Sequence, residues 1–261
     1  MSQMVVTYNE TRKGLLIMWD YRFSMLMEFF MIGMIFSGVM LFIGQGELKP
    51  EQLTSALLGF LITFYVMETI SRMSYALTAE AQAGTLEQMY MSPVSSVFFL
   101  FGRALSSFAM ASVSLMIMVP VLMLLFNIRF DLPLAGVVII VITLIGVAGF
   151  GLMIAGMTIV FKQTGPVANM MSNMMLFING TFLPVDQMPK WLESLAMILP
   201  STQGIIALRE VSLNSKTLIE LWSDGTLVYL TAHSSVCLIV GWMIFVWCER
   251  VARRQGSLGQ Y

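Results

Sequence analysis

The sequence predicts an all-α integral membrane protein with six transmembrane helices. Of its 261 residues, 57% are hydrophobic and only 11% are charged, whereas soluble domains carry about 45–50% apolar and about 25% charged residues. Six apolar runs are each long enough to cross a hydrocarbon core about 30 Å thick, which takes roughly 20 residues. The runs are Phe23–Ile43, Leu53–Ser71, Val94–Phe126, Leu134–Phe161, Pro166–Leu183 and Thr226–Cys248.

Lysine and arginine near the ends of these runs predict the orientation, because cytoplasmic loops carry an excess of both. With both termini inside, the cytoplasmic side holds Arg12, Lys13, Arg22, Arg72, Arg103, Lys162, Arg250, Arg253 and Arg254. The opposite side holds Lys49, Arg129, Lys190, Arg209 and Lys216. We therefore expect both termini in the cytoplasm. The net charge of −1 offers no electrostatic reason to expect nucleic acid as a partner.

Two segments on the cytoplasmic side have patterns of their own. Residues 8–22 place Leu15 and Trp19 at helical spacing beside basic residues, which predicts an amphipathic helix lying in the inner membrane interface. Residues 79–93 are mostly polar and end at Pro93, which predicts a short cytoplasmic helix between the second and third runs.

Residues 184–225 form the one long outer connection, and their pattern is not that of an ordinary loop. Three prolines punctuate it, Pro184, Pro189 and Pro200. Between them lies an apolar helical face made of Trp191, Leu192, Leu195, Ile198 and Leu199. Because a solvated loop would not carry such a face, we expect short re-entrant helices here.

Glycines and charged residues inside the runs carry further information. The fourth run contains Gly136, Gly146, Gly149, Gly151 and Gly156, which predicts close packing inside the bundle, since small residues let transmembrane helices approach. Glu68 and Arg72 are four residues apart in the favourable order for an ion pair. Glu28 and Arg103 lie near the inner ends of their runs and can extend to the interface. Anchoring and a role in gating or coupling both remain open for these four residues.

The residues that could perform chemistry are few. His233 is the only histidine, and a six-span protein with a helical histidine invites comparison with rhomboid proteases. Their Gly-x-Ser-Gly-like nucleophile context is missing, since the nearest fragment, Phe36-Ser37-Gly38, lacks the first glycine. One histidine and two cysteines cannot build a usual metal site. Cys237 and Cys248 are also too far apart along one helix to form a disulfide. We therefore interpret His233 as a hydrogen-bonding residue in helix packing, and we expect no catalytic site, cofactor or metal in this chain.

The two segments between the runs also contain recognisable motifs. The cytoplasmic one reads EAQAGTLEQMYMSP from Glu80 to Pro93, and the outer one reads NGTFLP, MPKWL, LP and LR between Asn179 and Arg209. With an amphipathic helix over Thr11–Arg22 in front of the first run, they resemble the permease subunits of the ABC-2 family, also called type V ABC exporters. The family pattern is E-x-x-x-G-T-L-E-x-L-x-x-[ST]-P, and Met89 stands where leucine is commoner. The resemblance covers nearly the whole chain.

The resemblance implies a permease subunit of an ATP-driven exporter in a bacterial inner or plasma membrane. Residues 79–93 would be the coupling helix that docks on a separate ATP-binding subunit, present in two copies. The expected coupling residues are Glu80, Gly84, Thr85, Leu86, Glu87, Gln88, Met89, Tyr90, Ser92 and Pro93. ATP and magnesium would be bound by that partner, because this chain lacks the Gly-x-x-x-x-Gly-Lys-Ser/Thr phosphate loop.

Two permease copies, forming a homodimer, would enclose the substrate path. Candidate lining residues on the fifth run are Met170, Asn173, Met174, Phe177 and Asn179. Methionine-rich and phenylalanine-rich spans fit drugs, lipids and lipid-linked glycans equally, so the substrate stays open, as does pairing with a related chain. Two alternatives also remain open: a membrane scaffold or channel without ATP coupling, and a rhomboid-like intramembrane enzyme.

Overall fold

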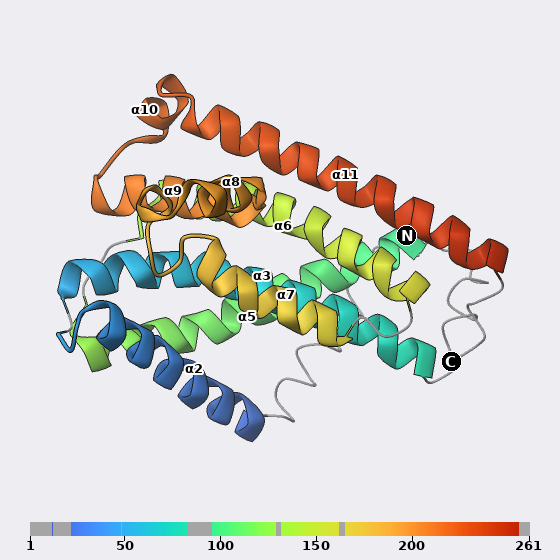
Figure 1. The fold of residues 1–261 in the computed structure, drawn as a ribbon, viewed down its shortest axis with the longest axis horizontal. Helices are drawn as coiled ribbons and strands as arrows, with labels where there is room; N and C mark the ends of the chain where they lie inside the picture. Colours follow the sequence, from blue (N-terminus) through green and yellow to red (C-terminus); the bar gives the residue numbers. More distant parts are fainter. Residues whose placement is uncertain are drawn as a thin grey trace.

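The chain folds as an elongated bundle of helices. The computed structural model describes residues 12, 22–47, 49–82, 96–128, 132–161 and 165–255, and these contain no β-strand. Figure 1 shows the long helices lying roughly along the longest axis. The elements are α2 (Arg22–Ile43), α3 (Pro50–Gln82), α5 (Ser96–Phe126), α6 (Leu134–Phe161), α7 (Gly165–Ile178), η1 (Val185–Gln187), α8 (Lys190–Ile198), α9 (Pro200–Leu213), α10 (Leu218–Ser223) and α11 (Thr226–Gln255).

Four helices among the described residues are long and apolar enough to cross a membrane, namely α3, α5, α6 and α11. The pair α8 and α9 would make a fifth if it is counted as one broken span. Helix α2 also contains an apolar stretch, Phe29–Ile43, but it is shorter than those of the four spanning helices. The prediction of an all-helical protein with several membrane helices is thus confirmed, and the exact layout of six spans is not.

The fifth predicted span, Pro166–Leu183, differs most from the structure. Its helix α7 ends at Ile178 and has 14 residues, about 21 Å at 1.5 Å per residue and hence shorter than the hydrocarbon core. Gly180, two residues after its end, adopts a positive φ of 84°, a conformation that ends a helix and that glycine adopts at little cost. The chain then turns through Pro184 into η1 instead of continuing to Leu183 as a helix.

Helix α3 is the central helix of the bundle. Most of its apolar stretch, Gln52–Tyr75, is buried inside the protein, whereas α5, α6 and α11 expose more than half of theirs. It packs against α5, α6, α7 and α9. The predicted ion pair on this helix is present, because the Arg72 guanidinium contacts the Glu68 carboxylate one turn away. The side chains of Glu28 and Arg103 lie outside the described part of the structure.

The largest helix contact joins α6 to α11 along a row of glycines, here called the glycine seam (Gly146, Gly149 and Gly156 of α6 with Gly241 of α11). A Cβ atom on Gly241 would overlap the backbone of Gly149, and one on Gly156 would lie 2.9 Å from the Phe245 Cα. The glycines of the fourth run therefore do allow a close approach between helices, although the burial expected for this helix is only partial, since α6 exposes more than half of its apolar stretch.

Residues 184–225, which we expected to form short re-entrant helices, do contain helices. Helix α8 begins directly after Pro189 and ends before Pro200, which is the first residue of α9. The axes of α8 and α9 meet at 96°. Helix α8 leaves Trp191, Leu195 and Ile198 exposed, while most of α9 is buried among α3, α6 and α11. The bend thus joins an exposed apolar helix to an interior one.

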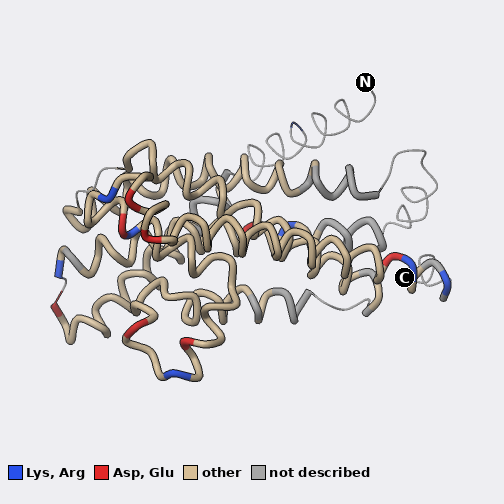
Figure 2. The backbone as a smooth tube through the Cα atoms, turned by 90° about the horizontal axis from the view of Figure 1, so that it is seen from above, with Lys and Arg blue, Asp and Glu red and all other residues tan. Residues whose placement is uncertain are grey.

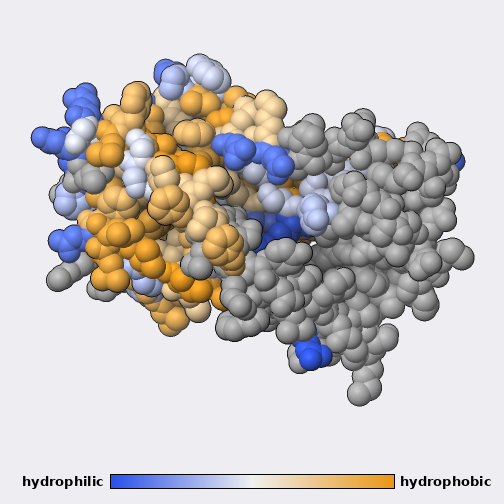
Figure 3. Space-filling model, turned by 90° about the horizontal axis from the view of Figure 1, so that it is seen from below, coloured by the Kyte–Doolittle hydropathy of each residue, from blue (hydrophilic) through white to orange (hydrophobic). Residues whose placement is uncertain are grey.

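The surface of the described part is that of a membrane protein. Large apolar side chains are widely exposed, for example Leu124 on α5 at 83%, where soluble proteins keep apolar patches small. On the face drawn in Figure 3 they form a broad hydrophobic area, bordered at one end by hydrophilic residues. Figure 2 shows lysine, arginine, aspartate and glutamate mostly toward the ends of the long helices.

Candidate functional site

The motif from Glu80 to Pro93 begins at the end of the central helix. Helix α3 continues to Gln82, so Glu80 lies on its last turn and not on a separate short helix. The other expected coupling residues, Gly84, Thr85, Leu86, Glu87, Gln88, Met89, Tyr90, Ser92 and Pro93, lie outside the described residues, and so does most of the expected interfacial helix at 8–22. What the structure adds is that this segment is attached directly to the most buried helix of the bundle.

Helix α7 brings four of the five expected path residues together. Met170, Asn173, Met174 and Phe177 recur at the helical spacing of three and four residues, and all four are exposed. The opposite face of α7 carries buried residues such as Met175 and packs on α3. The four side chains therefore form one continuous exposed stripe, here called the α7 stripe.

Asn179 does not belong to this stripe. Its side chain is fully buried, and its amide Nδ2 donates to the Thr63 hydroxyl of α3 at 2.8 Å. Its Oδ1 accepts from the backbone N–H and the hydroxyl of Thr181, at 3.2 and 2.6 Å. The Thr63 and Thr181 hydroxyls also contact each other. The expectation that Asn179 lines an open path is therefore not met in this conformation; the residue holds the turn after α7 against α3.

Arg209 fixes the same turn from the other side. From α9 its Nη2 donates to the Thr181 carbonyl at 2.7 Å, and its Nε and Nη2 both donate to the Ser55 carbonyl of α3. We call Arg209, Ser55 and Thr181 the arginine clamp. Gly59 of α3 makes room for it, since a Cβ there would lie 2.9 Å from the Thr181 backbone and 3.0 Å from Arg209 Nη2. The clamp ties α9, α3 and the α7–η1 turn into one unit.

Sequence reasoning placed Arg209 only as an outer-side cation and as part of the Leu-Arg motif. The available signal was an arginine that directly follows the apolar residues Ile205–Leu208, because an arginine must find partners when it is removed from water. Its partners are backbone carbonyls 154 and 28 residues away. No side-chain pattern identifies such acceptors.

Comparison with known proteins decides what this bundle is. Residues 4–213 match the family model described as ABC-2 type transporter. The chain belongs to that family. It is thus a permease of the ABC-2 type, a multi-pass membrane subunit of a transporter, as the motifs between the spans indicated.

Two permeases of known name are similar to this ABC-2 permease over part of its length. One is the linearmycin resistance permease protein LnrN of Bacillus subtilis, which is 26% identical over 183 residues, 70% of this chain and 47% of the relative. The other is the probable multidrug ABC transporter permease YbhR of Escherichia coli, which is 26% identical over 158 residues, 58% of this chain and 41% of the relative. The chain thus aligns with less than half the length of these relatives.

The single histidine of the ABC-2 permease sits in a packing environment. The His233 ring stacks on Tyr229, one turn earlier on α11, with ring centres 5.8 Å apart, and its Nε2 lies 4.0 Å from the Cys237 sulfur. Its buried Nδ1 has no hydrogen-bond partner within the described residues. The ring therefore packs by stacking on Tyr229 and lies within hydrogen-bonding distance of the Cys237 sulfur, in keeping with the predicted role in helix packing. Cys237 and Cys248 are both free thiols, as expected.

Proposed function

We propose that this chain is the permease subunit of an ATP-driven exporter, built with six spans and with both termini in the cytoplasm. The observation that carries the proposal is the family match over residues 4–213. The sequence contains no phosphate-binding loop, so a separate ATP-binding subunit, in two copies, would supply ATP hydrolysis. A second copy of this chain completes the transporter as a homodimer.

The α7 stripe supports the location of the substrate path. Asn173 is exposed in the middle of it, next to Met170 and Met174. An amide that faced lipid hydrocarbon would lose its hydrogen bonds to water at a cost of several kcal/mol. A second permease copy, with a hydrated path between the two, would remove that cost. The stripe therefore faces the partner copy across the path, and its methionines and Phe177 accommodate varied apolar groups.

The cargo is an amphipathic or hydrophobic molecule, moved outward. The names of the two relatives refer to linearmycin resistance and to multidrug transport, which supports removal of a compound from the cell. A drug, a lipid or a lipid-linked glycan would each fit a path lined by methionine and phenylalanine. Export proceeds by alternating access, in which nucleotide state shifts the population of inward-facing and outward-facing bundles.

Helix α3 is the mechanical link in this proposal. It runs without a break from Pro50 to Gln82, about 50 Å at 1.5 Å per residue. Its C-terminal end leads into the coupling segment, and its N-terminal half carries Ser55 and Thr63, which hold α9 and the turn after α7. A displacement of the coupling segment by the ATPase would thus reach the outer helices through a single rigid element.

Replacing Glu87 by alanine tests the link to the ATPase. The residue lies outside the expected spans, so insertion and pairing of permeases should be unchanged. Truncation of one member of a buried interfacial charge pair costs about 2–5 kcal/mol, and of a rim charge much less. We therefore expect weaker co-purification of the ATP-binding subunit, or hydrolysis no longer stimulated by substrate. Glu47→Ala, on the exposed loop between α2 and α3, is the matched control and should behave as the parent.

A second variant and a labelling experiment test the remaining parts. Replacement of residues 84–92 by a glycine–serine linker should abolish transport while the helices still insert; transport at the parental rate would refute the exporter assignment. In a cysteine-free background, single cysteines at positions 88 and 255 should resist an impermeant thiol reagent in whole cells, and one at position 215 should react. The opposite labelling pattern would reverse the orientation.

A further inference from the structure

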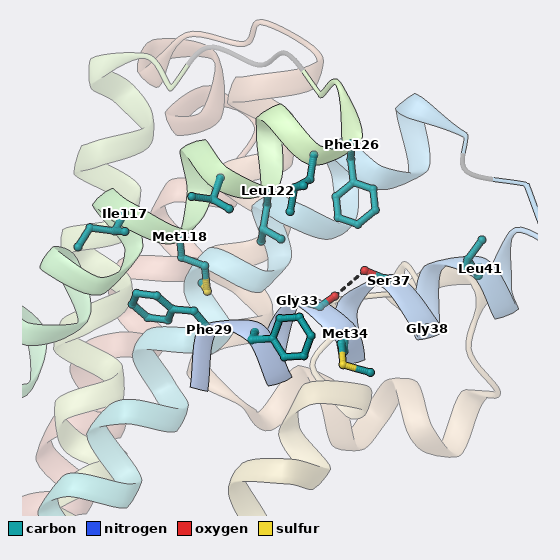
Figure 4. A pocket seen from close by; sticks show the side chains of 13 residues that line it. Phe29, Gly33, Met34, Ser37, Gly38, Leu41, Ile117, Met118, Leu122 and Phe126 are labelled. Atoms are coloured by element: carbon teal, nitrogen blue, oxygen red, sulfur yellow. Dashed lines mark hydrogen bonds between the residues drawn. The ribbon is translucent and has the colours of Figure 1, made fainter. Parts of the chain in front are cut away.

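A large pocket opens between α2 and α5, and none of its lining residues belongs to the α7 stripe. Its volume is about 620 Å³, within the usual range for ligand sites. Figure 4 shows residues of the two helices facing each other across it, with Gly33, Ser37 and Gly38 on α2 opposite Met118 and Leu122 on α5. The lining residues recur every three to four positions on both helices, so the pocket follows the helix axes.

The lining of the pocket is hydrocarbon almost throughout. It contains no charged residue, and its one side-chain hydroxyl, on Ser37, already donates to the Gly33 carbonyl at 2.5 Å. Water would find too few partners there, because an ordered water needs two to four polar contacts. The ligand that fits such a wall is itself apolar.

Small residues on α2 create the space. A Cβ on Gly38 would meet nothing within 4 Å, and one on Gly33 would meet only Leu122 Cδ2, at 3.9 Å. These glycines differ from those of the glycine seam, where the neighbouring helix fills the gap. An unfilled gap leaves the lining atoms without dispersion partners, so an occupant stabilises the pair of helices.

The dimensions of the pocket match an extended hydrocarbon chain. Its lining runs from Phe29 to Leu41 on α2 and from Ile117 to Phe126 on α5, between about 14 and 18 Å at 1.5 Å per residue. One leaflet of a hydrocarbon core about 30 Å thick has about this depth.

The pocket is also continuous with the surface that the bilayer covers. Phe30, Met34, Leu125 and Val121 line it and are exposed at its rim, and Leu124 and Met116 extend the same apolar surface along α5. In a multi-pass membrane protein, lipid chains are the apolar groups in contact with such a rim.

We propose that the pocket between α2 and α5 is a binding site for one acyl chain of a bilayer phospholipid, which lies in it parallel to the helices. By filling this space, the acyl chain holds α2 and α5 at their present separation. This site is independent of the proposed transport path, because none of its lining residues belongs to the α7 stripe.

Photo-crosslinking from the lipid side tests the proposal. The purified full-length permease is reconstituted in phosphatidylcholine vesicles that contain a phosphatidylcholine with a diazirine in the middle of one acyl chain. After irradiation, mass spectrometry of peptides maps the adducts. We expect adducts per exposed residue to be several-fold more frequent over residues 29–41 and 117–126 than over the lipid-facing surface of α11. Equal frequencies on all helices would overturn the proposal.

A variant that fills the pocket gives the specific control. Gly38→Phe places a ring in the free space with no backbone clash, and should lower adducts in the pocket several-fold. Val236→Phe, at an exposed position on α11, should leave them unchanged. Size-exclusion profiles and melting temperatures establish that both variants fold; if Gly38→Phe fails to fold, Gly38→Leu replaces it. Undiminished adducts in the folded variant would refute an acyl-chain site. So would crosslinks from a photoreactive side chain at position 34 to another permease copy in place of lipid.

Discussion

Arg209 on α9 donates two hydrogen bonds to a single carbonyl oxygen, that of Ser55 on α3, through Nε at 3.1 Å and Nη2 at 3.0 Å. The same Nη2 reaches the Thr181 carbonyl at 2.7 Å. A planar guanidinium can serve two acceptors in this way, whereas an ammonium group is a compact point charge. The arginine clamp therefore depends on the shape of the side chain as well as on its charge.

Replacement of Arg209 should destabilise the permease. Arg209→Met leaves the Thr181 carbonyl without its partner inside the protein, and an unsatisfied buried group costs about 1–3 kcal/mol. Arg209→Lys keeps the charge but loses the fork, so its loss should be intermediate. Thermal unfolding in detergent measures both, with Lys190→Met on the exposed surface of α8 as the control. A methionine variant as stable as the parent would contradict the role of the clamp.

Asn173 and Asn179 should behave in opposite ways. Asn179→Ala removes three buried hydrogen bonds and should lower the melting temperature, at a cost on the order of 1–3 kcal/mol. Asn173→Ala, on the exposed α7 stripe, should leave stability unchanged and reduce transport if the stripe lines the path. Measuring unfolding and transport on both variants separates the roles, and equal loss of stability in both would contradict the assignment.

Gly149 and Gly241 should tolerate no side chain. Alanine at position 241 would force α11 away from the Gly149 backbone, and overpacking of this kind costs typically 1–3 kcal/mol. The yield of folded permease and its melting temperature should fall for Gly241→Ala and further for Gly149→Val. Gly38→Ala is the control, because its Cβ meets no atom within 4 Å.

Acid should loosen α10, which lies outside the candidate spans. A capping box starts this helix: the Thr217 N–H donates to Glu220 Oε2 at 2.7 Å, and the Thr217 hydroxyl accepts from the Glu220 N–H at 3.3 Å. The hydrogen bond from the Thr217 backbone lowers the pKa of Glu220. The stabilisation of α10 by the ionised Glu220 carboxylate is therefore fully present above the ordinary pKa of glutamate. It is lost as the pH falls through the lowered pKa of Glu220.

Hydrogen exchange of residues 218–223 as a function of pH checks this. Protection corrected for intrinsic exchange should be constant near neutral pH and decrease in acid. Glu220→Gln should show weaker protection at pH 7 and little further change in acid. An acid response as large in that variant as in the parent would assign the effect to another group.

Local features of this fold were predictable where a residue type has one strong preference. Pro189 and Pro200 mark the starts of α8 and α9, because proline suits the first turn of a helix and interrupts one that is already running. Glu68 and Arg72 form their ion pair because both partners lie on one helix. The glycines of α6 indicated close packing. They did not indicate that α11 would be the helix in contact with them.

Features that depend on distant segments were not predictable. In the sequence, Asn179 is a polar residue within an apolar run. Its side chain points inward because it bonds to Thr63, which lies 116 residues away in the chain. The early end of α7 depends on the positive φ at Gly180, which a glycine permits but does not require. The pocket between α2 and α5 depends on how far apart two helices come to rest. None of these quantities is a property of one segment.

The glycine seam has a consequence for biogenesis. Gly149 and Gly241 lie about ninety residues apart in the chain, and chains are made from the N-terminus onward. While η1 to α10 are synthesised, the glycine row of α6 is therefore not yet covered by α11. Gly149 and Gly156 acquire their partner only when α11, the last described helix, is inserted, whereas Gly146 also contacts Pro200 of α9. A chain stopped before Thr226 would therefore lack the helix that covers the backbone of Gly149.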